Sequence, residues 1–514
     1  MKNFQFKDQS GSALLIFVVV LMGIGGVVGA ELLASKLESV KQEKINHDYK
    51  VLRQAKKALL SFAVDYKVDA DFYEMGRLPC PDNTFTVSTE GIQSGNCGAR
   101  HANAVGYFPW KTLGIDILRD SNGECLWYAV SGDYKGSPKA NMLNEDSNGL
   151  FVIQDENGVL QHGAAPGDRP IAIIIAPGDR LQGQNGALED PNMEHCKGNY
   201  NESDYLESGG IIDYGVDHED TADDIWTFLY GSIGSRLDNS DFNDKMVWIT
   251  KDEYWDAVRA QGDLDVDIVG SEIDQLTSDI TQCFLDYAQD GNNENKWLPW
   301  PAAIDLVEYR NDAVNGGANE YVDILNPPLL IGRVPQDISN SDAQEFALPG
   351  ASQIATHPNK NDIFLTCLTP DRYELWQNWK DHFFYVVSKD FEMTNGSVAL
   401  PIGNRCVAAG DCVEIVPAPA ALNKIAAIVF YSSSVIVGQS RDSTPVDADE
   451  KNEIENYLDV INPTKSNAHL YPADAAYLGD VNKYYNETDV DTGDLAWCIA
   501  VNAAGTNLVR TDCT

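Results

Sequence analysis

The fold is decided by residues 11–66, which read GSALLIFVVVLMGIGGVVGA over 11–30 and ELLASKLESVKQEKINHDYKVLRQAKKALLSFAVDY over 31–66. The run 12–30 has no charged residue, and as a helix rising about 1.5 Å per residue it is long enough to cross the hydrocarbon core of a bilayer. Lys2 and Lys7 come before this run, so we expect the leader to stay on the cytoplasmic side. An uncleaved single-span anchor and a cleaved export signal are the alternatives.

The segment that follows is amphipathic. No Gly or Pro interrupts 31–66, and apolar residues recur mostly at steps of three or four, the period of a helix. These residues are Leu33, Leu37, Val40, Ile45, Tyr49, Leu52, Ala55, Leu59, Phe62 and Tyr66. The pattern predicts one long helix over 12–66 whose later part packs against another surface, with a coiled coil as the alternative.

The segment 11–20 resembles the prepilin peptidase site of type IV pilins and type II secretion pseudopilins. In this family a cytoplasmic peptidase cuts after the Gly, the new N-terminus is methylated, and the helix packs into a filament drawn from the membrane. The resemblance implies processing between Gly11 and Ser12, and a helix whose C-terminal half packs against a sheet. The family usually has Glu at the fifth residue after the cut, where this chain has Ile16; some minor pilins, including the tip pseudopilin, also lack that Glu.

The resemblance therefore implies a minor or tip subunit. Its partners would be other pilin or pseudopilin subunits, the prepilin peptidase and the inner membrane. One span in the inner membrane would leave the bulk of the chain in the periplasm, or outside the cell in an assembled filament.

Charge is distributed unevenly along the chain. It carries 37 basic and 78 acidic side chains, a net charge of −41, yet residues 1–66 hold 9 of the basic and only 6 of the acidic ones. The region after residue 66 is therefore strongly acidic. Such a region is repelled by nucleic acid and by anionic lipid, so nucleic acid is excluded as a partner.

All ten cysteines lie beyond the apolar run, at Cys80, Cys97, Cys125, Cys196, Cys283, Cys367, Cys406, Cys412, Cys498 and Cys513. An even number in a periplasmic region predicts up to five disulfide bonds, whose connectivity stays open. The two local pairs that we favour are Cys406 with Cys412 and Cys498 with Cys513. No CxxC pair occurs, which argues against a zinc ribbon or a thioredoxin-type site.

We predict an α+β fold in four parts: a leader at 1–11, the transmembrane and amphipathic helix at 12–66, and globular domains at 67–260 and 261–514. The globular domains are expected to be rich in antiparallel sheet. In the first, 151–161 predicts a hairpin and 171–176 a buried strand.

Landmarks of the first domain recur in the same order in the second, which makes the second a candidate repeat of the first. The matched segments are 77–81 with 297–301, 126–131 with 383–388, 172–175 with 427–430, 205–207 with 457–459, and 247–248 with 496–497. One insertion between Trp300 and Phe383 accounts for the change in offset. The acidic segment 261–267 is the expected linker.

Catalytic motifs are missing from the sequence, so we expect no enzyme. Its eight histidines lack the HExxH spacing of a zinc protease, and no nucleophile elbow, P-loop or GxGxxG is present. Cys196, beside His195, is expected to be half of a disulfide bond. A membrane-anchored envelope enzyme is the weakest of the alternatives.

Two kinds of ligand remain open from sequence. Calcium, with no committed ligand residue, would suit the oxygen-rich turns at 120–124, 290–294 and 489–494 or the aspartates of 263–267, although such residues also simply form turns. A surface adhesin on a pilin stalk would use aromatic side chains of the second domain. These are Trp297, Trp300, Tyr373, Trp376, Trp379 and Phe383, which could equally form a core.

Overall fold

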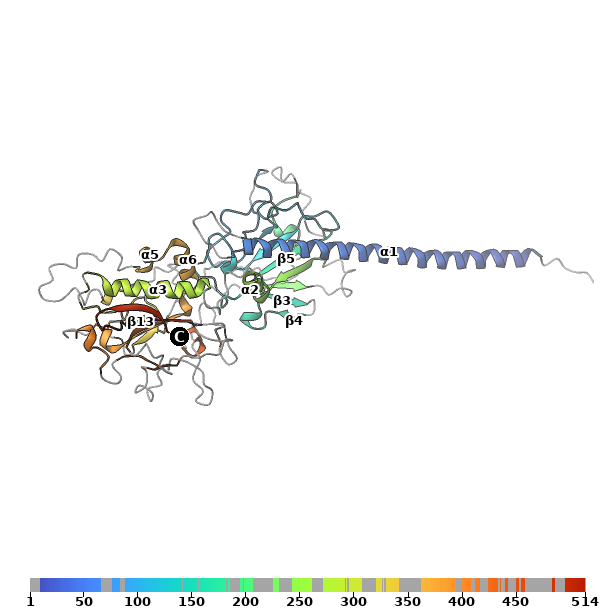
Figure 1. Cartoon of the computed structure of the whole chain (residues 1–514). Coiled ribbons are helices and arrows are strands. Elements are labelled where there is room, and N and C mark those ends of the chain that lie inside the picture. The colour runs from blue at the N-terminus through green and yellow to red at the C-terminus, as the bar shows by residue number, and fades with distance from the viewer. Residues whose placement is uncertain are drawn as a thin grey trace, which may run out of the picture.

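The computed structural model describes the 514-residue chain over a series of ranges. These are 10–65, 76–83, 88–140, 142–155, 158–181, 184, 195–196, 198–206, 225–230, 243–260, 271–291, 293, 295–306, 320–325, 327, 330–341, 362–393, 400–407, 412–416, 424–432, 435, 440–441, 450–452, 454–457, 483–485 and 495–513. Only the backbone is described at 10–34, 414–416, 450, 455, 483–485 and 495. Within these limits the fold is mixed α+β, as predicted (Figure 1).

The first element is the long helix α1, which runs from Ser10 to Asp65. Its side chains are exposed throughout 35–44, including Leu37 (58%) and Val40 (52%), and its apolar stripe becomes buried from Ile45 onward. The helix therefore extends out of the head and enters it near Ile45 (Figure 1). Among the described residues, no helix combines the length and apolar character that a membrane crossing requires. The predicted span at 12–30 lies outside the described side chains and stays a prediction.

The buried half of α1 packs against an antiparallel sheet of four strands in the order β1-β2-β5-β7. The strands are β1 (Ala104–Tyr107), β2 (Trp127–Val130), β5 (Ala172–Ala176) and β7 (Lys245–Ile249). Every residue of β5 is buried, which confirms the buried strand predicted at 171–176. Its run of Ile side chains suits a central strand that has one face against α1 and the other against a second layer.

The second layer is a smaller sheet with the order β4-β3-β6. The hairpin predicted at 151–161 is confirmed as β3 (Phe151–Asp155) and β4 (Leu160–His162), which pair antiparallel. Strand β6 (Trp226–Tyr230) pairs in parallel with β3. Helix α2 (Lys251–Arg259) follows β7 and begins with a capping box between Thr250 and Glu253.

The second half also has an antiparallel sheet, here of five strands in the order β8-β9-β11-β13-β14. Its strands are β8 (Ile331–Arg333), β9 (Phe383–Val387), β11 (Ile425–Tyr431), β13 (Leu495–Val501) and β14 (Leu508–Asp512). Helix α3 (Glu272–Gln289) packs on β11, β13 and β14, and α5 (Phe364–Cys367) and α6 (Pro370–Trp379) lie beside it. Strands β10 (Glu414–Val416) and β12 (Lys483–Tyr485) form a separate parallel pair.

Short 3-10 turns complete the described elements. They are η1 (Gly132–Tyr134), η2 (Pro166–Asp168), η3 (Glu202–Asp204), η5 (Lys380–His382), η6 (Lys389–Phe391), η7 (Ile402–Asn404), η8 (Glu450–Asn452) and η9 (Ile454–Asn456). Two of them, η5 and η8, carry charged side chains into the contact between the halves.

Backbone hydrogen bonds recur at matched positions of the two halves. The N–H of Ser131 donates to the carbonyl of Ile171, and that of Ser388 donates to the carbonyl of Ala426, both at 2.8 Å. Leu78 and Leu298 form parallel bridges with the strands' continuations, at Lys135 and Glu392. The segments matched at 77–81, 126–131 and 172–175 thus occupy corresponding places in two sheets of like order.

One sequence match is displaced by a residue. Trp248 of β7 lies opposite Ile173, whereas the residue opposite Ile428 in the second sheet is Cys498 rather than Trp497. A register shift between Ile425 and Ala427 is recorded in the β11–β13 pairing. The sequence match pairs Trp248 with Trp497 because each follows an apolar residue within a predicted strand.

The two halves share one hydrophobic cluster, which includes Leu52 of α1, Ile174 of β5, Phe284 of α3 and Val429 of β11. The outer faces of the two sheets form separate hydrophobic clusters, one around Trp127 in the first half and one around Phe384 in the second. The expected linker at 261–267 and the residue Tyr66 lie outside the described residues.

All ten cysteines are paired, which confirms the predicted disulfide content. The bonds join Cys80 to Cys97, Cys125 to Cys196, Cys283 to Cys367, Cys406 to Cys412, and Cys498 to Cys513. The two local pairs predicted from spacing are therefore confirmed. Each bond joins cysteines of the same half, so none of them holds the two halves together.

Candidate functional site: a buried ion cluster between the halves

The predicted processing site lies at the start of α1. Gly11 and Ser12 directly follow Ser10, the first residue of the helix, in the part for which only the backbone is described. Cleavage after Gly11 would leave a mature chain that begins within this helix. Processing at this position stays a prediction.

The turn at 120–124 uses its carboxylate oxygens for internal hydrogen bonds. Oδ1 of Asp120 accepts from the backbone N–H groups of Asn122 (2.8 Å) and Glu124 (3.0 Å), and Oδ2 accepts from Gly178 (2.9 Å). The pKa of Asp120 is raised overall by burial, although hydrogen bonds from these N–H donors partly oppose the shift. The side chain of Asp120 therefore stabilises a turn, which is the alternative to calcium binding given for this segment.

The other calcium candidates are only partly described. In 290–294, the side chain of Asn293 donates to the carbonyl of Trp297 and accepts from its N–H. Asn292 and Glu294, and the whole of 489–494 and 263–267, lie outside the described residues. No calcium ligand is assigned.

The aromatic cluster of the second half is mostly core. Trp300, Trp376, Trp379 and Phe383 are each at most 1% exposed, and Trp297 is 7% exposed. Trp376 packs on Phe383 and Phe364, with ring centroids 5.5 and 4.7 Å apart. These rings stabilise the second half from inside and do not offer the exposed surface that an adhesin would need.

Cys196 and Ser388 have structural roles. Cys196 is bonded to Cys125. Ser388 is buried, and its Oγ donates to the carbonyl of Ile425 (2.6 Å) while accepting from the N–H of Val413 (2.9 Å). The hydrogen bonds of Ser388 connect the end of β9 to Ile425, at the start of β11, and to Val413.

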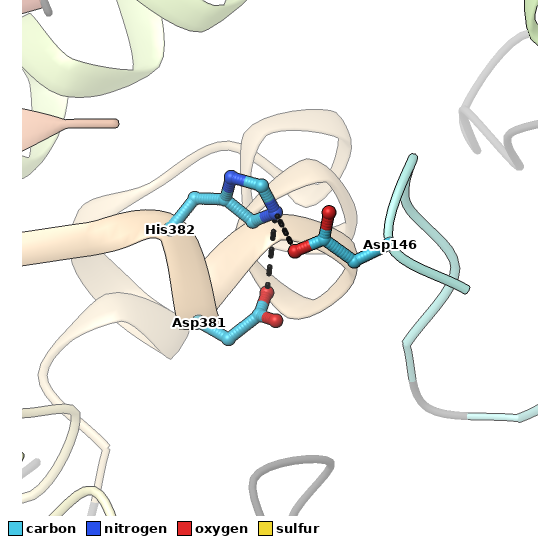
Figure 2. Close-up of side chains that lie close together, drawn as sticks. All are labelled: Asp146, Asp381 and His382. Atoms are coloured by element: carbon cyan, nitrogen blue, oxygen red, sulfur yellow. Dashed lines mark ion pairs between the residues drawn. The ribbon is translucent and has the colours of Figure 1, made fainter. Parts of the chain in front are cut away.

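The strongest concentration of buried charge lies where the halves meet. A turn of the first half carries Asp146, and η5 carries Asp381 and His382 (Figure 2). Lys451 comes from η8. The Nζ of Lys451 lies 2.8 Å from Oδ2 of Asp381 and 3.2 Å from Oδ2 of Asp146. All four side chains are at most 4% exposed. An ammonium group is therefore held, away from water, between carboxylates from both halves.

His382 and three further side chains enclose these three charged groups. Nε2 of His382 lies 3.2 Å from Oδ2 of Asp146, and Figure 2 shows the imidazole facing both carboxylates. Its Nδ1 lies 3.4 Å from Nη1 of Arg441, and its ring stacks on Tyr431 at 5.6 Å. The hydroxyl of Tyr457 lies 3.5 Å from Asp381. Aromatic rings and the imidazole thus form the walls around the charges.

Amide side chains hold the same contact from its edge. Nδ2 of Asn144 donates to Oδ1 of Asp381 (2.8 Å) and to the carbonyl of Asn378 (3.0 Å). Oδ1 of Asn378 in turn accepts from the N–H of Leu143 (2.9 Å) and from the guanidinium of Arg77 (3.2 Å). These bonds fix the turn of the first half against α6 and η5.

The charges set the ionisation of the two carboxyl groups. Burial alone would raise the pKa of Asp146, but Lys451, His382 and Arg441 hold it well below its ordinary value. The pKa of Asp381 is likewise raised by burial and lowered overall by Lys451 and His382. Burial raises the pKa of Tyr457 to about 12, so its hydroxyl remains protonated. The ground state of the cluster is an ion pair in a dry site.

A metal ion is a poor fit to this cluster, although Asp146, Asp381 and His382 place donor atoms within 4.8 Å of one another. The ammonium of Lys451 already lies between the two carboxylates. A divalent cation would have to displace it and would then meet a second cation, Arg441, beside the imidazole. The residues support an internal ion cluster.

Sequence reasoning missed this site. Asp146 and Lys451 are 305 positions apart and neither lies in a recognisable motif. No protein-family model, no curated protein and no solved structure matches the chain. The stem helix, the paired sheets and this cluster are therefore the features from which a function has to be inferred.

Proposed function

We propose that this chain is a minor or tip subunit of a type IV pilus or a type II secretion pseudopilus, processed by a prepilin peptidase between Gly11 and Ser12. The observation that carries the proposal is α1, which is exposed over 35–44 and buried against an antiparallel sheet from Ile45. A stem whose free part continues into the uncharged run 12–30 suits a subunit that is first anchored in a membrane and then packed into a filament.

The head supports a tip position. We propose that it consists of two tandem pilin-like units, because β2-β5-β7 and β9-β11-β13 share their order and α1 and α3 each cover one sheet. Tyr205 packs on Trp127 at 5.4 Å, and Tyr457 packs on Phe384 at 5.3 Å, at matched positions of the outer faces. Within the part of the chain that the structure describes, only the first unit continues from a stem. A double head on one stem is hard to repeat along a tightly packed shaft, whereas a tip offers room.

In this proposal the head lies in the periplasm or outside the cell. Five disulfide bonds suit an oxidising compartment. The partners are other pilin or pseudopilin subunits, which meet the exposed part of α1, together with the prepilin peptidase and the inner membrane. The acidic head remains soluble and away from anionic lipid.

The test is the N-terminal mass of the chain expressed with and without a prepilin peptidase. We expect a mature chain that starts at Ser12, methylated, only when the peptidase is present. Gly11→Val should abolish this processing, while Gly29→Val, the same substitution inside the apolar run 12–30, should leave it intact. An unprocessed Met1 in both strains would refute the proposal and leave a single-span anchor.

A further inference from the structure

We propose that Lys451 and Asp146 condense to an intramolecular amide, a covalent cross-link between the two halves of the head. It would cross-link halves that are otherwise joined by the polypeptide backbone, because the described disulfide bonds are all internal to one half. The proposal is independent of the pilin assignment, because it rests on the ion cluster alone.

Proximity is the first requirement, and the cluster meets it. Nζ of Lys451 is 3.2 Å from Oδ2 of Asp146, so the amine is held beside the carboxyl group that it would attack. Both side chains are held by neighbours: Lys451 also by Asp381, and Asp146 also by His382. Two reacting groups positioned in this way have an effective concentration far above that of free solutes.

Exclusion of water is the second requirement. Lys451 is 1% and Asp146 4% exposed, and the rings of Tyr431, Tyr457 and His382 lie around them. Condensation releases water, so a dry site favours the amide. It also exchanges a buried ion pair, which carries a large desolvation cost, for a neutral group. Condensation removes one positive charge (Lys451) and one negative charge (Asp146). Arg441 and Asp381 remain as a cation and an anion, so positive and negative charge still balance in the cluster.

The second carboxylate supplies the proton transfers. The ammonium of Lys451 passes one proton to Oδ2 of Asp381 at 2.8 Å, and Asp381 passes it on to the carboxylate of Asp146. The resulting amine attacks Cγ of the now neutral carboxyl group of Asp146. Nε2 of His382, 3.2 Å from Oδ2 of Asp146, faces the developing oxyanion and stabilises its charge. Asp381 carries this proton and then a second one from the nitrogen to the leaving oxygen. The C–N bond forms, a C–O bond breaks, water departs, and Asp381 ends as it began.

The lowered pKa values of the two carboxyl groups define the starting state of this step. The resting cluster is ionised, and the amide forms from its less populated neutral form, in which a proton has moved from nitrogen through Asp381 to Asp146. We therefore expect slow condensation after folding. Asn144, which holds Oδ1 of Asp381 at 2.8 Å, keeps the proton carrier in place during that time.

Two other lysine–carboxylate pairs, both more exposed, lack this setting. Lys139 and Glu374 also join the two halves, at 2.7 Å, but are 34% and 17% exposed. Lys56 and Glu253, at 2.6 Å, are 22% and 46% exposed. Water solvates both pairs and keeps them as ions. The pair Lys139–Glu374 is thus a natural control.

The experiment is the intact mass of the full chain, purified from an oxidising compartment, incubated, then denatured and fully reduced. We expect a mass one water molecule below that of the processed or unprocessed sequence. Tryptic digestion should yield a branched peptide containing Asp146 and Lys451, with no cleavage after Lys451. This peptide separates the cross-link from a succinimide, for example at Asp290–Gly291, which also loses water but stays linear.

Variants assign the roles. Lys451→Arg keeps the charge but cannot condense, and Asp381→Asn keeps the shape but removes the proton carrier, so both should have the full mass. Lys139→Arg should retain the loss of water. A wild-type chain of full mass that is cleaved after Lys451 would overturn the proposal, and so would a branched peptide that persists in Lys451→Arg. Neither outcome bears on whether Gly11 is processed.

Discussion

The point at which α1 enters the head predicts how two single substitutions on the same helix should differ. Leu52 is fully buried between the helix and the sheet, whereas Val40, three turns earlier, is 52% exposed. Truncating a buried Leu to Ala removes its transfer free energy and leaves a cavity, which together cost about 2–5 kcal/mol. Truncating an exposed Val usually changes the free energy of unfolding by less than about 0.5 kcal/mol.

These energies convert to melting temperatures. For a folding unit of roughly 150–250 residues, each kcal/mol moves the melting temperature by about 2–4 °C. Leu52→Ala should therefore lower the melting temperature of the first half by about 4–20 °C, and Val40→Ala by no more than about 2 °C. Differential scanning calorimetry of the chain in detergent would measure both, and hydrogen exchange along α1 would locate the change.

The result that would refute this reasoning is specific. Equal shifts for the two variants, or amide protection over 35–44 as strong as that over 45–65, would mean that the head covers the stem further than the structure shows. The stem available to a filament would then be shorter than proposed. Val40→Ala is the matched control, because it also removes aliphatic carbon from the apolar stripe of the same helix.

Three further predictions concern the head. The lowered pKa values of Asp146 and Asp381 add stability to the folded chain, which is present above the ordinary carboxyl pKa and lost as pH falls through the folded value. In freshly folded chain, the acid unfolding of Asp381→Asn should therefore depend less steeply on pH than that of the wild type. Replacing Cys498 and Cys513 by Ser opens a loop of separation 15 and should cost about 3 kcal/mol in a thermal melt, more than opening the separation of 6 between Cys406 and Cys412; equal losses would contradict the loop-length argument. Gly332→Ala should destabilise more than Gly106→Ala, because the new Cβ would lie 2.0 Å from a backbone oxygen of Ala302, whereas in Gly106→Ala its nearest neighbour, at 2.1 Å, is a side-chain atom of Asn83; a greater loss of soluble yield for Gly106→Ala would reverse this ranking.

Local features of the fold could be predicted because their causes are local. The absence of Gly and Pro over 31–66 predicted one long helix, and α1 ends at Asp65, within a residue of that expectation. The Ile-rich strand at 171–176 and the hairpin at 151–161 follow from apolar runs and turn residues close together in sequence. The two confirmed local disulfide pairs span short loops, which leave few partners to choose from.

Features that depend on residues far apart in the sequence were predicted less precisely. The tryptophans 248 and 497 looked equivalent, but strand pairing places Cys498 at the matched position. The oxygen-rich turn at 120–124 suggested a cation, yet Asp120 is engaged with backbone N–H groups that only the folded chain brings to it, including that of Gly178. The aromatic cluster of the second half admitted two interpretations until its burial was known.

By itself, the sequence determined an uncharged run joined to an amphipathic helix, an acidic α+β head with ten cysteines, and the order of segments in two similar halves. The tertiary structure decided where the stem enters the head, and that Asp146, Asp381 and Lys451 meet in one dry cluster. The reason is physical. Helices and turns depend on neighbours a few residues away, whereas a buried ion pair depends on which surfaces exclude water together, and no local pattern encodes that.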